Sequence, residues 1–459
     1  MENLKSKGSK KELYRQLAVV AVPIALQSLV ASSLNLIDNL MVGFMGEAEL
    51  GAVGAGMQIY FIGWIFLFGF SAGASTFVAQ FWGAKDLVNI RKTMGFAIVI
   101  CEAVGLVFFM FAFFAPEVVM RVFTNIPQTI ELGSQYVRWG SACFLLMPVL
   151  IILEMSLRST QQTKIPMYIS FVAFAMNTFM NWVLIFGHFG LPALGVRGAA
   201  LATVVSRIVE LSLDIIVIFV RKNKIAGPLR EFFGWSRELA VRVVRNSLPT
   251  MINEGAWSVA TSMYVAAYAR VGVTEYAAYQ AAETIDVLFI MGAFSLGDAA
   301  LIIIGAKLGE GKLEEAYDIA KTILKACVLV GVIASVLLAL CSGPMVSIFN
   351  FTEEGSRDAR LILLVFSGVL TVDVLCGALV TGVLRSGGDT RFAMLADVGT
   401  IWLIGVPMAW ISTAVMHWPI YIAVALSKME LVVKVFIVMA RFISKKWVRQ
   451  HVLWDMIID

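Results

Sequence analysis

The chain has 459 residues, of which 59% are hydrophobic and only 15% are charged, and its formal net charge is +4. Soluble domains are about 45–50% apolar and about 25% charged, so this composition excludes an ordinary soluble protein and indicates a polytopic membrane protein. The five cysteines lie in or beside apolar segments and form no CxxC pair, which predicts buried thiols and excludes a disulfide framework.

Twelve apolar segments follow one another along the chain. Each has about 20 residues or more, enough to cross a bilayer as an α-helix. The basic start of the chain runs into the first segment without a small-residue cleavage site, so we expect no cleaved signal peptide. The predicted spans are 15–43, 51–82, 92–115, 133–157, 164–187, 193–220, 241–269, 276–307, 318–341, 357–384, 391–414 and 417–443.

The second half of the sequence repeats the first. Pro23 matches Pro249, and the same spacing of 226 residues pairs the segment GEAELGA at 46–52 with 272–278. Further on the spacing becomes 227 residues, which pairs the Leu-Arg-Ser turn at 157–159 with the one at 384–386. Because each repeat holds six spans, an even number, both enter the membrane in the same orientation. We therefore predict two six-helix lobes related by a pseudo-two-fold axis along the membrane normal.

The distribution of basic residues predicts the orientation. If the N-terminus is cytoplasmic, most of the 36 Lys and Arg residues fall in inner segments, and the outer loops hold only Arg121, Arg138, Arg197, Arg270, Arg357 and Arg360. Both termini are thus expected in the cytoplasm. The longest and most basic connection separates the repeats. We predict an N-lobe at 1–220, a cytoplasmic linker at 221–240 that faces anionic lipid, and a C-lobe at 241–459.

Polar residues in spans one, five and six predict an oxygen-rich site in the N-lobe. Asp38 is the only carboxylate within the first span, where such a group is costly to insert. Asn177 and Asn181 share one helix face, as do Ala199 and Thr203. With a rise of 1.5 Å per residue, Asp38, Asn181 and Thr203 all lie about 8–15 Å below the outer end. Such ligands suit Na⁺ or a protonatable carboxylate; alternatively, the asparagines only join helices.

The C-lobe lacks this set and has two carboxylates near the midplane, Glu254 and Asp373. They could share a proton or attract a cation, or stay neutral and hydrogen-bonded inside a packed lobe. Further intramembrane acids are candidates for lining a cavity: Glu102, Glu154, Asp286, Asp298 and Asp397. Arg207–Glu210 and Lys428–Glu430 are interpreted as local pairs or snorkelling groups.

No enzymatic signature is present. The three histidines have no metal-ligand spacing, and no GxxxxGK[ST] loop occurs, so the chain itself is not expected to hydrolyse ATP. An ion gradient is the energy source that the sequence favours for a two-lobed transporter. We expect no cofactor, no nucleic-acid partner, contact with membrane lipid and a monomer.

The chain resembles the multidrug and toxic compound extrusion (MATE) family of cation-coupled antiporters over essentially its whole length. The features that carry the resemblance are Pro23 with Asp38, the GEAELGA segment with its copy, and the Leu-Arg-Ser turns. Asp373, twelve residues before Arg385, is similar to the span-ten aspartate of the NorM-like branch. The family's N-lobe cation positions fall on Asp38, Asn177, Asn181, Ala199 and Thr203.

The resemblance implies export of amphipathic organic cations and drugs across the prokaryotic cytoplasmic membrane, in exchange for Na⁺ or H⁺ and by alternating access. Na⁺ would bind at Asp38, Asn177, Asn181 and Thr203. Related members have a second aspartate at the position of Asn181, so the sequence leaves the coupling ion open. Glu254 lies on the helix of the family's C-lobe acid, at a shorter spacing from Pro249. The alternative function is a flippase for lipid-linked oligosaccharide or lipid, of the same superfamily; its cationic cavity would not need these acids.

Overall fold

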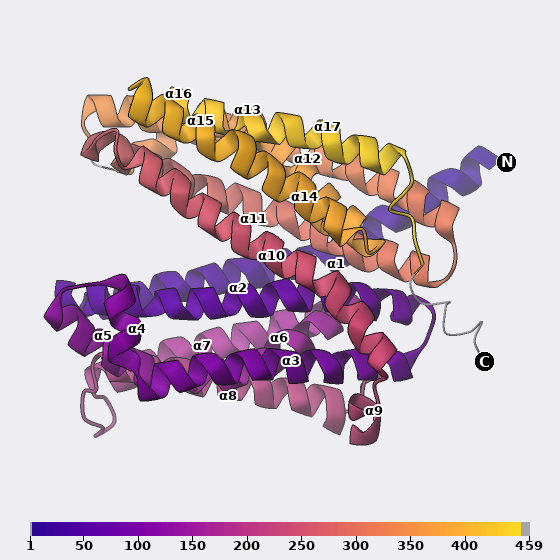
Figure 1. The fold of residues 1–459 in the computed structure, drawn as a ribbon, viewed down its shortest axis with the longest axis horizontal. Coiled ribbons are helices and arrows are strands. Elements are labelled where there is room, and N and C mark those ends of the chain that lie inside the picture. Colours follow the sequence, from indigo (N-terminus) through magenta and orange to yellow (C-terminus); the bar gives the residue numbers. More distant parts are fainter. Residues whose placement is uncertain (1, 350, 451–459) are drawn as a thin grey trace. The chain divides into compact units, whose positions relative to one another are not determined.

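The computed structural model describes residues 2–349 and 351–450, and every regular element within these ranges is helical (Figure 1). The predicted all-α fold class is thus confirmed. Elements of the first half are α1 (Glu2–Gly43), α2 (Glu47–Gly83), α3 (Leu87–Phe114), α4 (Pro116–Phe123), α5 (Pro127–Gly140), α6 (Cys143–Ser159), α7 (Lys164–Phe186), α8 (Val196–Ile215), the π-helical η1 (Ile216–Val220) and α9 (Leu229–Phe233).

The second half begins with three long helices and ends with shorter ones separated by π-helical turns. Its elements are α10 (Arg237–Tyr268), α11 (Val273–Gly309), α12 (Leu313–Val346), α13 (Glu353–Gly377), η2 (Ala378–Leu384), α14 (Thr390–Thr400), η3 (Ile401–Gly405), α15 (Val406–Trp410), η4 (Ile411–Val415), α16 (Ile420–Ser427) and α17 (Met429–Ile443). All twelve predicted spans lie on these helices.

Local chemistry explains several helix ends. The Asp86 side chain accepts a hydrogen bond of 2.9 Å from the backbone N–H of Asn89 and so caps α3. Thr352 caps α13 in the same way, through a bond of 3.2 Å from Gly355. Gly187 ends α7 in the left-handed conformation with φ of 77°, which glycine adopts without steric cost.

Within the described residues, eight helices are long and apolar enough to cross a membrane, and the pair α5–α6, bent by 51°, makes a ninth if it is counted as one span. The other three predicted spans, 193–220, 241–269 and 417–443, are helical in the structure. They carry more charge or are interrupted: Arg207, Glu210 and Asp214 lie on α8, and Lys428 separates α16 from α17. These charges are central to the site described below.

Two compact units make up the described chain. The first unit contains 26–78 and 85–247, and the second contains 2–25, 79–84 and the described residues from 248 onward. Three helices, α1, α2 and α10, therefore contribute residues to both units. The predicted boundaries at 220 and 240 follow the repeat in the sequence and remain a prediction.

The helices of each unit pack closely against one another. In the first unit α8 packs against α5, α6 and α7, and in the second α13 packs against α11, α12, α16 and α17 (Figure 1). The core of the second unit includes Leu17, Val20 and Ile24, which lie on the first part of α1. This part of α1 is thus a structural element of the second unit.

The linker is anchored on α3. Arg91 forms an ion pair of 2.5 Å with Glu231 and donates a hydrogen bond of 3.2 Å to the carbonyl of Ile225. Ile225 and Phe232 are buried. The segment predicted to be a lipid-facing linker is therefore tied to the first unit through a basic residue and two apolar ones.

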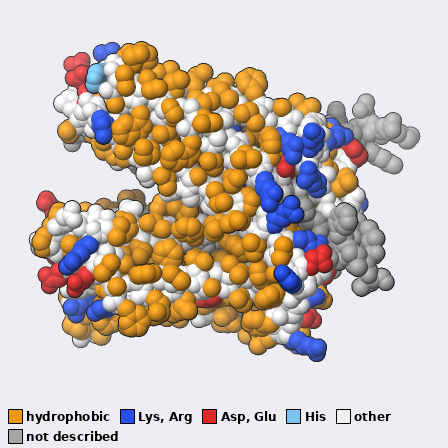
Figure 2. Space-filling model, in the orientation of Figure 1, with side chains coloured by type: hydrophobic (Ala, Val, Ile, Leu, Met, Phe, Trp, Pro, Cys, Tyr) orange, Lys and Arg blue, Asp and Glu red, His pale blue; other side chains and the backbone are white. Residues whose placement is uncertain are grey.

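Hydrophobic side chains cover the middle of the helices in both units, and most visible Lys and Arg side chains gather near the helix ends (Figure 2). Large apolar side chains such as Leu403, Phe436 and Val122 are more than two-thirds exposed. An exposed apolar belt with charged ends is the surface that a bilayer requires.

Candidate functional site

A carboxylate and two asparagine amides meet inside the first unit. Asp38 on α1 accepts a hydrogen bond from the Nδ2 of Asn181 on α7. The same Nδ2 donates to Asn177 Oδ1, one turn earlier on α7, over 3.0 Å. Both asparagines are buried, and Asp38 is half-buried. The structure thus brings together Asp38 and Asn181, which the sequence placed at one depth with Thr203, and Asn177, which shares a helix face with Asn181.

The neighbouring helix α8 supplies a hydroxyl and a backbone carbonyl. Thr203 Oγ1 donates a bond of 3.1 Å to the carbonyl of Ala199, which is buried. Arg207, one turn further on, is near enough to Asp38 to attract it electrostatically, although its guanidinium bonds Glu210. Arg207 belongs to a helix far from Asp38 in sequence, so residue spacing gives no sign of this approach.

Two amide atoms of the site lack partners among the described residues. Asn181 Oδ1 and Asn177 Nδ2 are buried and make no hydrogen bond there. Rotating the Asn181 amide would direct its oxygen toward Asp38, and such orientations follow from the hydrogen-bond network. With that rotation, one carboxylate and two amide oxygens could contact a cation, or an amide oxygen could accept from a protonated carboxyl group; without it, the Nδ2 hydrogen bond stabilises the ionised carboxylate.

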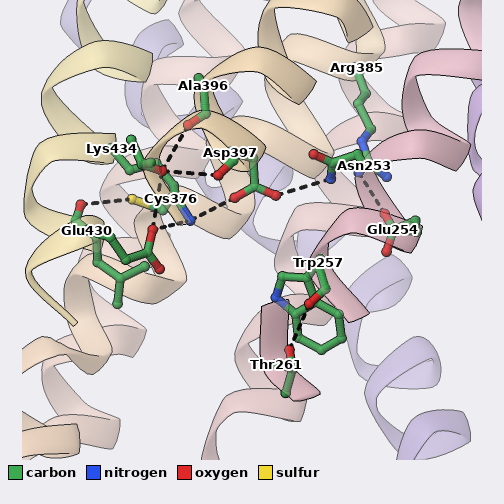
Figure 3. A network of polar contacts seen from close by, with 12 residues as sticks. Asn253, Glu254, Trp257, Thr261, Cys376, Arg385, Ala396, Asp397, Glu430 and Lys434 are labelled. Carbon is green, nitrogen blue, oxygen red and sulfur yellow. Dashed lines mark hydrogen bonds and ion pairs between the residues drawn. The ribbon is translucent and has the colours of Figure 1, made fainter. Parts of the chain in front are cut away.

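The second unit holds a different arrangement, in which basic side chains lie among the acids (Figure 3). Lys434 on α17 contacts Asp397 at 2.7 Å and Glu430 at 2.9 Å, and only 6% of its side chain is exposed. Asn253 on α10 donates to the other oxygen of Asp397 over 3.1 Å. Thr400 donates to Glu430 over 3.2 Å. Each carboxylate of this network therefore accepts from a base and from a neutral donor.

The two predicted midplane acids have separate surroundings. Glu254 forms an ion pair of 2.7 Å with Arg385, whose side chain is 4% exposed (Figure 3). Asp373 on α13 is half-buried and lies near Asp286 of α11, close enough for the two carboxylates to repel each other. The structure thus pairs Glu254 with a base and places Asp373 beside another acid. A role of either in binding remains a prediction.

Among the predicted local pairs, Arg207–Glu210 is confirmed. Glu430, however, contacts Lys434 one turn later, while Lys428 lies 5.3 Å from the centre of the Phe366 ring. Residues two apart in a helix point to different faces, and this spacing was the signal that should have excluded Lys428–Glu430. Lys434 was not singled out from the sequence, although it lies four residues after Glu430.

In the described part of the chain, no three or more His, Cys, Asp or Glu side chains are placed so that they could hold a metal ion. The described cysteines are all free; four are buried, and Cys341 is half-buried.

Comparison with known proteins gives the family. The MatE family model matches twice, over residues 23–183 and 248–411, in agreement with the repeat in the sequence. Probable multidrug resistance protein NorM of Thermotoga maritima is 24% identical over 98% of this chain and 97% of its own. Probable multidrug resistance protein YoeA of Bacillus subtilis is 24% identical over 88% of each chain.

Solved structures agree in fold. A transporter of the MOP superfamily from Pyrococcus furiosus, described as having a binding pocket of reverse polarity, superposes with a TM-score of 0.84 at 18% identity, over 95% of this chain and 97% of that one. An outward-facing multidrug resistance MATE family transporter gives the same TM-score and identity. This likeness confirms the polytopic twelve-helix fold. With the family model matching most of its length, the chain belongs to the MATE family of multidrug transporters and is not an enzyme.

Proposed function

We propose that this transporter is a secondary antiporter that exports amphipathic organic cations in exchange for Na⁺ or H⁺. The observation that carries the proposal is the hydrogen bond from Asn181 to Asp38 inside the first unit, where Asn181 also bonds Asn177. A carboxylate is rarely retained within a membrane-spanning helix unless it has a function. Here its hydrogen-bond partner is a neutral amide, and the nearby Arg207 guanidinium is bonded to Glu210, so the charge of Asp38 is available to an ion.

The role of Asp38 follows from its two states. When ionised, it attracts Na⁺ with the help of amide oxygens from Asn177 and Asn181 and the hydroxyl of Thr203. When protonated, it is neutral and can donate a hydrogen bond. Either event removes one negative charge from the site. A change in charge alters the relative free energies of two conformations only if they bind the ion with different affinities.

Helix α1 is the element that would respond. Its residues up to Ala25 belong to the second unit and those from Leu26 to the first, so any movement between units must deform it. Pro23 removes one backbone hydrogen bond near this point and provides a position at which the helix can bend. Ion binding at Asp38 on the same helix is then linked to alternating access.

The remaining assignments complete the proposal. Glu254 and Asp373 supply carboxylates to the second unit for a cation or a substrate. The protein works as a monomer in the prokaryotic cytoplasmic membrane, contacts lipid, and has both termini in the cytoplasm. The carboxylates in both units are suited to cationic substrates and disfavour an anionic lipid-linked oligosaccharide as cargo.

Asp38→Asn tests the proposal, because the amide keeps the size of the side chain and permanently mimics its neutral state. In vesicles loaded with a fluorescent organic cation, under an imposed Na⁺ or proton gradient, we expect gradient-driven efflux to be lost while binding of the cation persists. Asp318→Asn, at an exposed acid on α12, is the control and should transport normally. Efflux at the wild-type rate in Asp38→Asn would refute the assignment.

A further inference from the structure

Helix α8 carries a second polar feature further along the face that holds Thr203. Arg207, Glu210 and Asp214 follow Thr203 at intervals of three or four residues, and so share one side of the helix. Asp214 lies near the end of α8 and is completely buried. Neither of its carboxylate oxygens has a hydrogen-bond partner among the described residues.

The groups around Asp214 are mostly acidic. Glu154 on α6 and Glu210 on α8 are close enough to repel an ionised Asp214. The two guanidinium groups near Glu154 are bonded elsewhere: Arg207 donates to Glu210, and Arg158 donates to Gln27 over 2.6 Å. Gln27 in turn donates to Glu154 over 3.3 Å.

The other helices packed on α8 carry few charged residues, and none of these that the structure describes is hydrogen-bonded to Asp214. The only charged residue of α7 is Lys164, its first residue. On α5 the charged residues are Glu131 and Arg138. This helix lies beside the opposite end of α8, because Arg197 in the first turn of α8 donates to Gln135 of α5 over 3.0 Å. An ionised Asp214 would therefore be a buried charge that accepts no hydrogen bond, beside two other acids.

The second unit shows the contrast within the same chain. At the spacing of 227 residues, Arg207 matches Lys434 and Asp214 matches Arg441. Lys434 contacts two carboxylates (Figure 3), and Arg441 donates two bonds, of 2.6 and 3.1 Å, to Asp389. In the second repeat, the positions that correspond to Arg207 and Asp214 therefore hold basic residues with carboxylate partners. At these matched positions, the unpartnered carboxylate occurs in the first unit.

We propose that Asp214 is a second protonation site of the first unit, where a neutral carboxylic acid lies beside Glu154 and Glu210. Asp214 is further along α8 than Thr203 and Arg207, away from the Asp38 site. Loading the site adds one proton to a carboxylate oxygen and removes one negative charge from the cluster. Releasing the proton restores that charge. A proton suits the site because it needs only a single lone pair of one Asp214 oxygen.

Arg207 links this site to Asp38. Its guanidinium is attracted by Asp38, by Glu154 and by Glu210. Neutralising Asp38 removes one of these attractions and thereby changes the field at the acids near Asp214. By reciprocity, the proton at Asp214 biases ion binding at Asp38. This link rests on the proposed coupling role of Asp38, whereas protonation of Asp214 does not.

Infrared spectroscopy of the purified full-length protein at neutral pH tests the site. Subtracting the Asp214→Asn spectrum from that of the wild type should show the loss of a carbonyl band of a protonated carboxylic acid. The control Glu210→Gln removes an acid that is paired with Arg207 and should remove carboxylate bands instead. Asp214→Glu keeps an acid, so the carboxylic-acid band should remain but shift. This conservative variant gives a readout even if Asp214→Asn fails to fold.

The outcomes separate the two proposals. If Asp214→Asn removes carboxylate bands, or Asp214→Glu shows no shifted carboxylic-acid band, the second site is overturned, whatever Asp38 does. If Asp38→Asn still couples a gradient to efflux while the Asp214 band is present, the role of Asp38 fails and the protonation site stands. If both the coupling role of Asp38 and the protonation of Asp214 stand, the carboxylic-acid band of Asp214 should titrate at a different pH in Asp38→Asn than in the wild type. An unchanged titration would refute the link through Arg207.

Discussion

The two units differ in whether their buried charged side chains have partners of opposite charge. In the first, Asp38 accepts from an amide while the nearby Arg207 bonds Glu210, and Asp214 has no hydrogen-bond partner among the described residues. In the second, Lys434 lies between two carboxylates. A buried pair stabilises little compared with a hydrophobic substitute, but removing one partner is costly, because the other charge stays buried without compensation.

Lys434→Met should therefore destabilise the second unit. It leaves Asp397 and Glu430 facing each other without the ammonium group, and loss of one partner of a buried pair costs about 3–5 kcal/mol. We expect a lower midpoint of thermal unfolding in detergent. Lys428→Met, at a half-buried lysine over the Phe366 ring, should cost much less.

A compensating variant makes this prediction sharper. Adding Asp397→Asn and Glu430→Gln to Lys434→Met removes the uncompensated charges and should recover most of the lost stability. If the triple variant unfolds at the same temperature as Lys434→Met alone, the loss comes from packing around the lysine stem, and electrostatic compensation is not its cause.

The sequence could predict residues that lie near each other on one helix, and much less of what meets between helices. Asn177 and Asn181 were placed correctly because a spacing of four fixes a shared face, and Asp38 because its depth could be counted from the end of its span. The approach of Arg207 to Asp38 and the contact of Lys434 with Asp397 depend on how separate helices pack. Residue spacing contains no information about that packing.

At the scale of elements, the helices were predictable because long apolar segments have few alternatives in a bilayer. Their bends were not, since the 51° break between α5 and α6 and the π-helical turns after α13 and α14 leave little trace in composition. Close contacts between helix backbones do leave a trace in the sequence, because they require glycine. Gly83 and Gly309 are equivalent in the repeat, and both lie where the end of α2 meets the end of α11.

Gly309→Ala should disrupt this helix contact. A Cβ atom at residue 309 would lie 1.8 Å from the backbone oxygen of Gln80, so one of the two helices must shift. Overpacking of this kind costs about 1–3 kcal/mol. Gly292→Ala on the same helix α11 has no atom within 4 Å of the new methyl group and serves as the control. Equal thermal stabilities for the two variants, measured in detergent, would show that the contact tolerates a larger separation.

At the scale of the whole molecule, the two units exchange parts of their helices. The chain passes between them within α1 after Ala25 and within α10 after Ser247. Pro23 and Pro249 lie within two residues of these points and are equivalent in the repeat. The repeat was visible in the sequence, but the exchange was not, because it depends on long-range packing such as that of Leu17 and Ile24 in the core of the second unit.

The orientation in the membrane is the last prediction, and the bias of Lys and Arg toward one side supplies its reason. Single cysteines at Glu117 and Glu353 should react from outside intact cells with an impermeant thiol reagent. Cysteines at Lys85 and Lys312 should react only after the cells are opened.

All four positions are exposed, so reactivity reports the side of the membrane and not burial. The background is the chain with Cys341 replaced by serine, since the other four cysteines are buried. If only the cysteines at positions 85 and 312 react in intact cells, the orientation is the reverse of the predicted one, and Asp38 lies toward the cytoplasm.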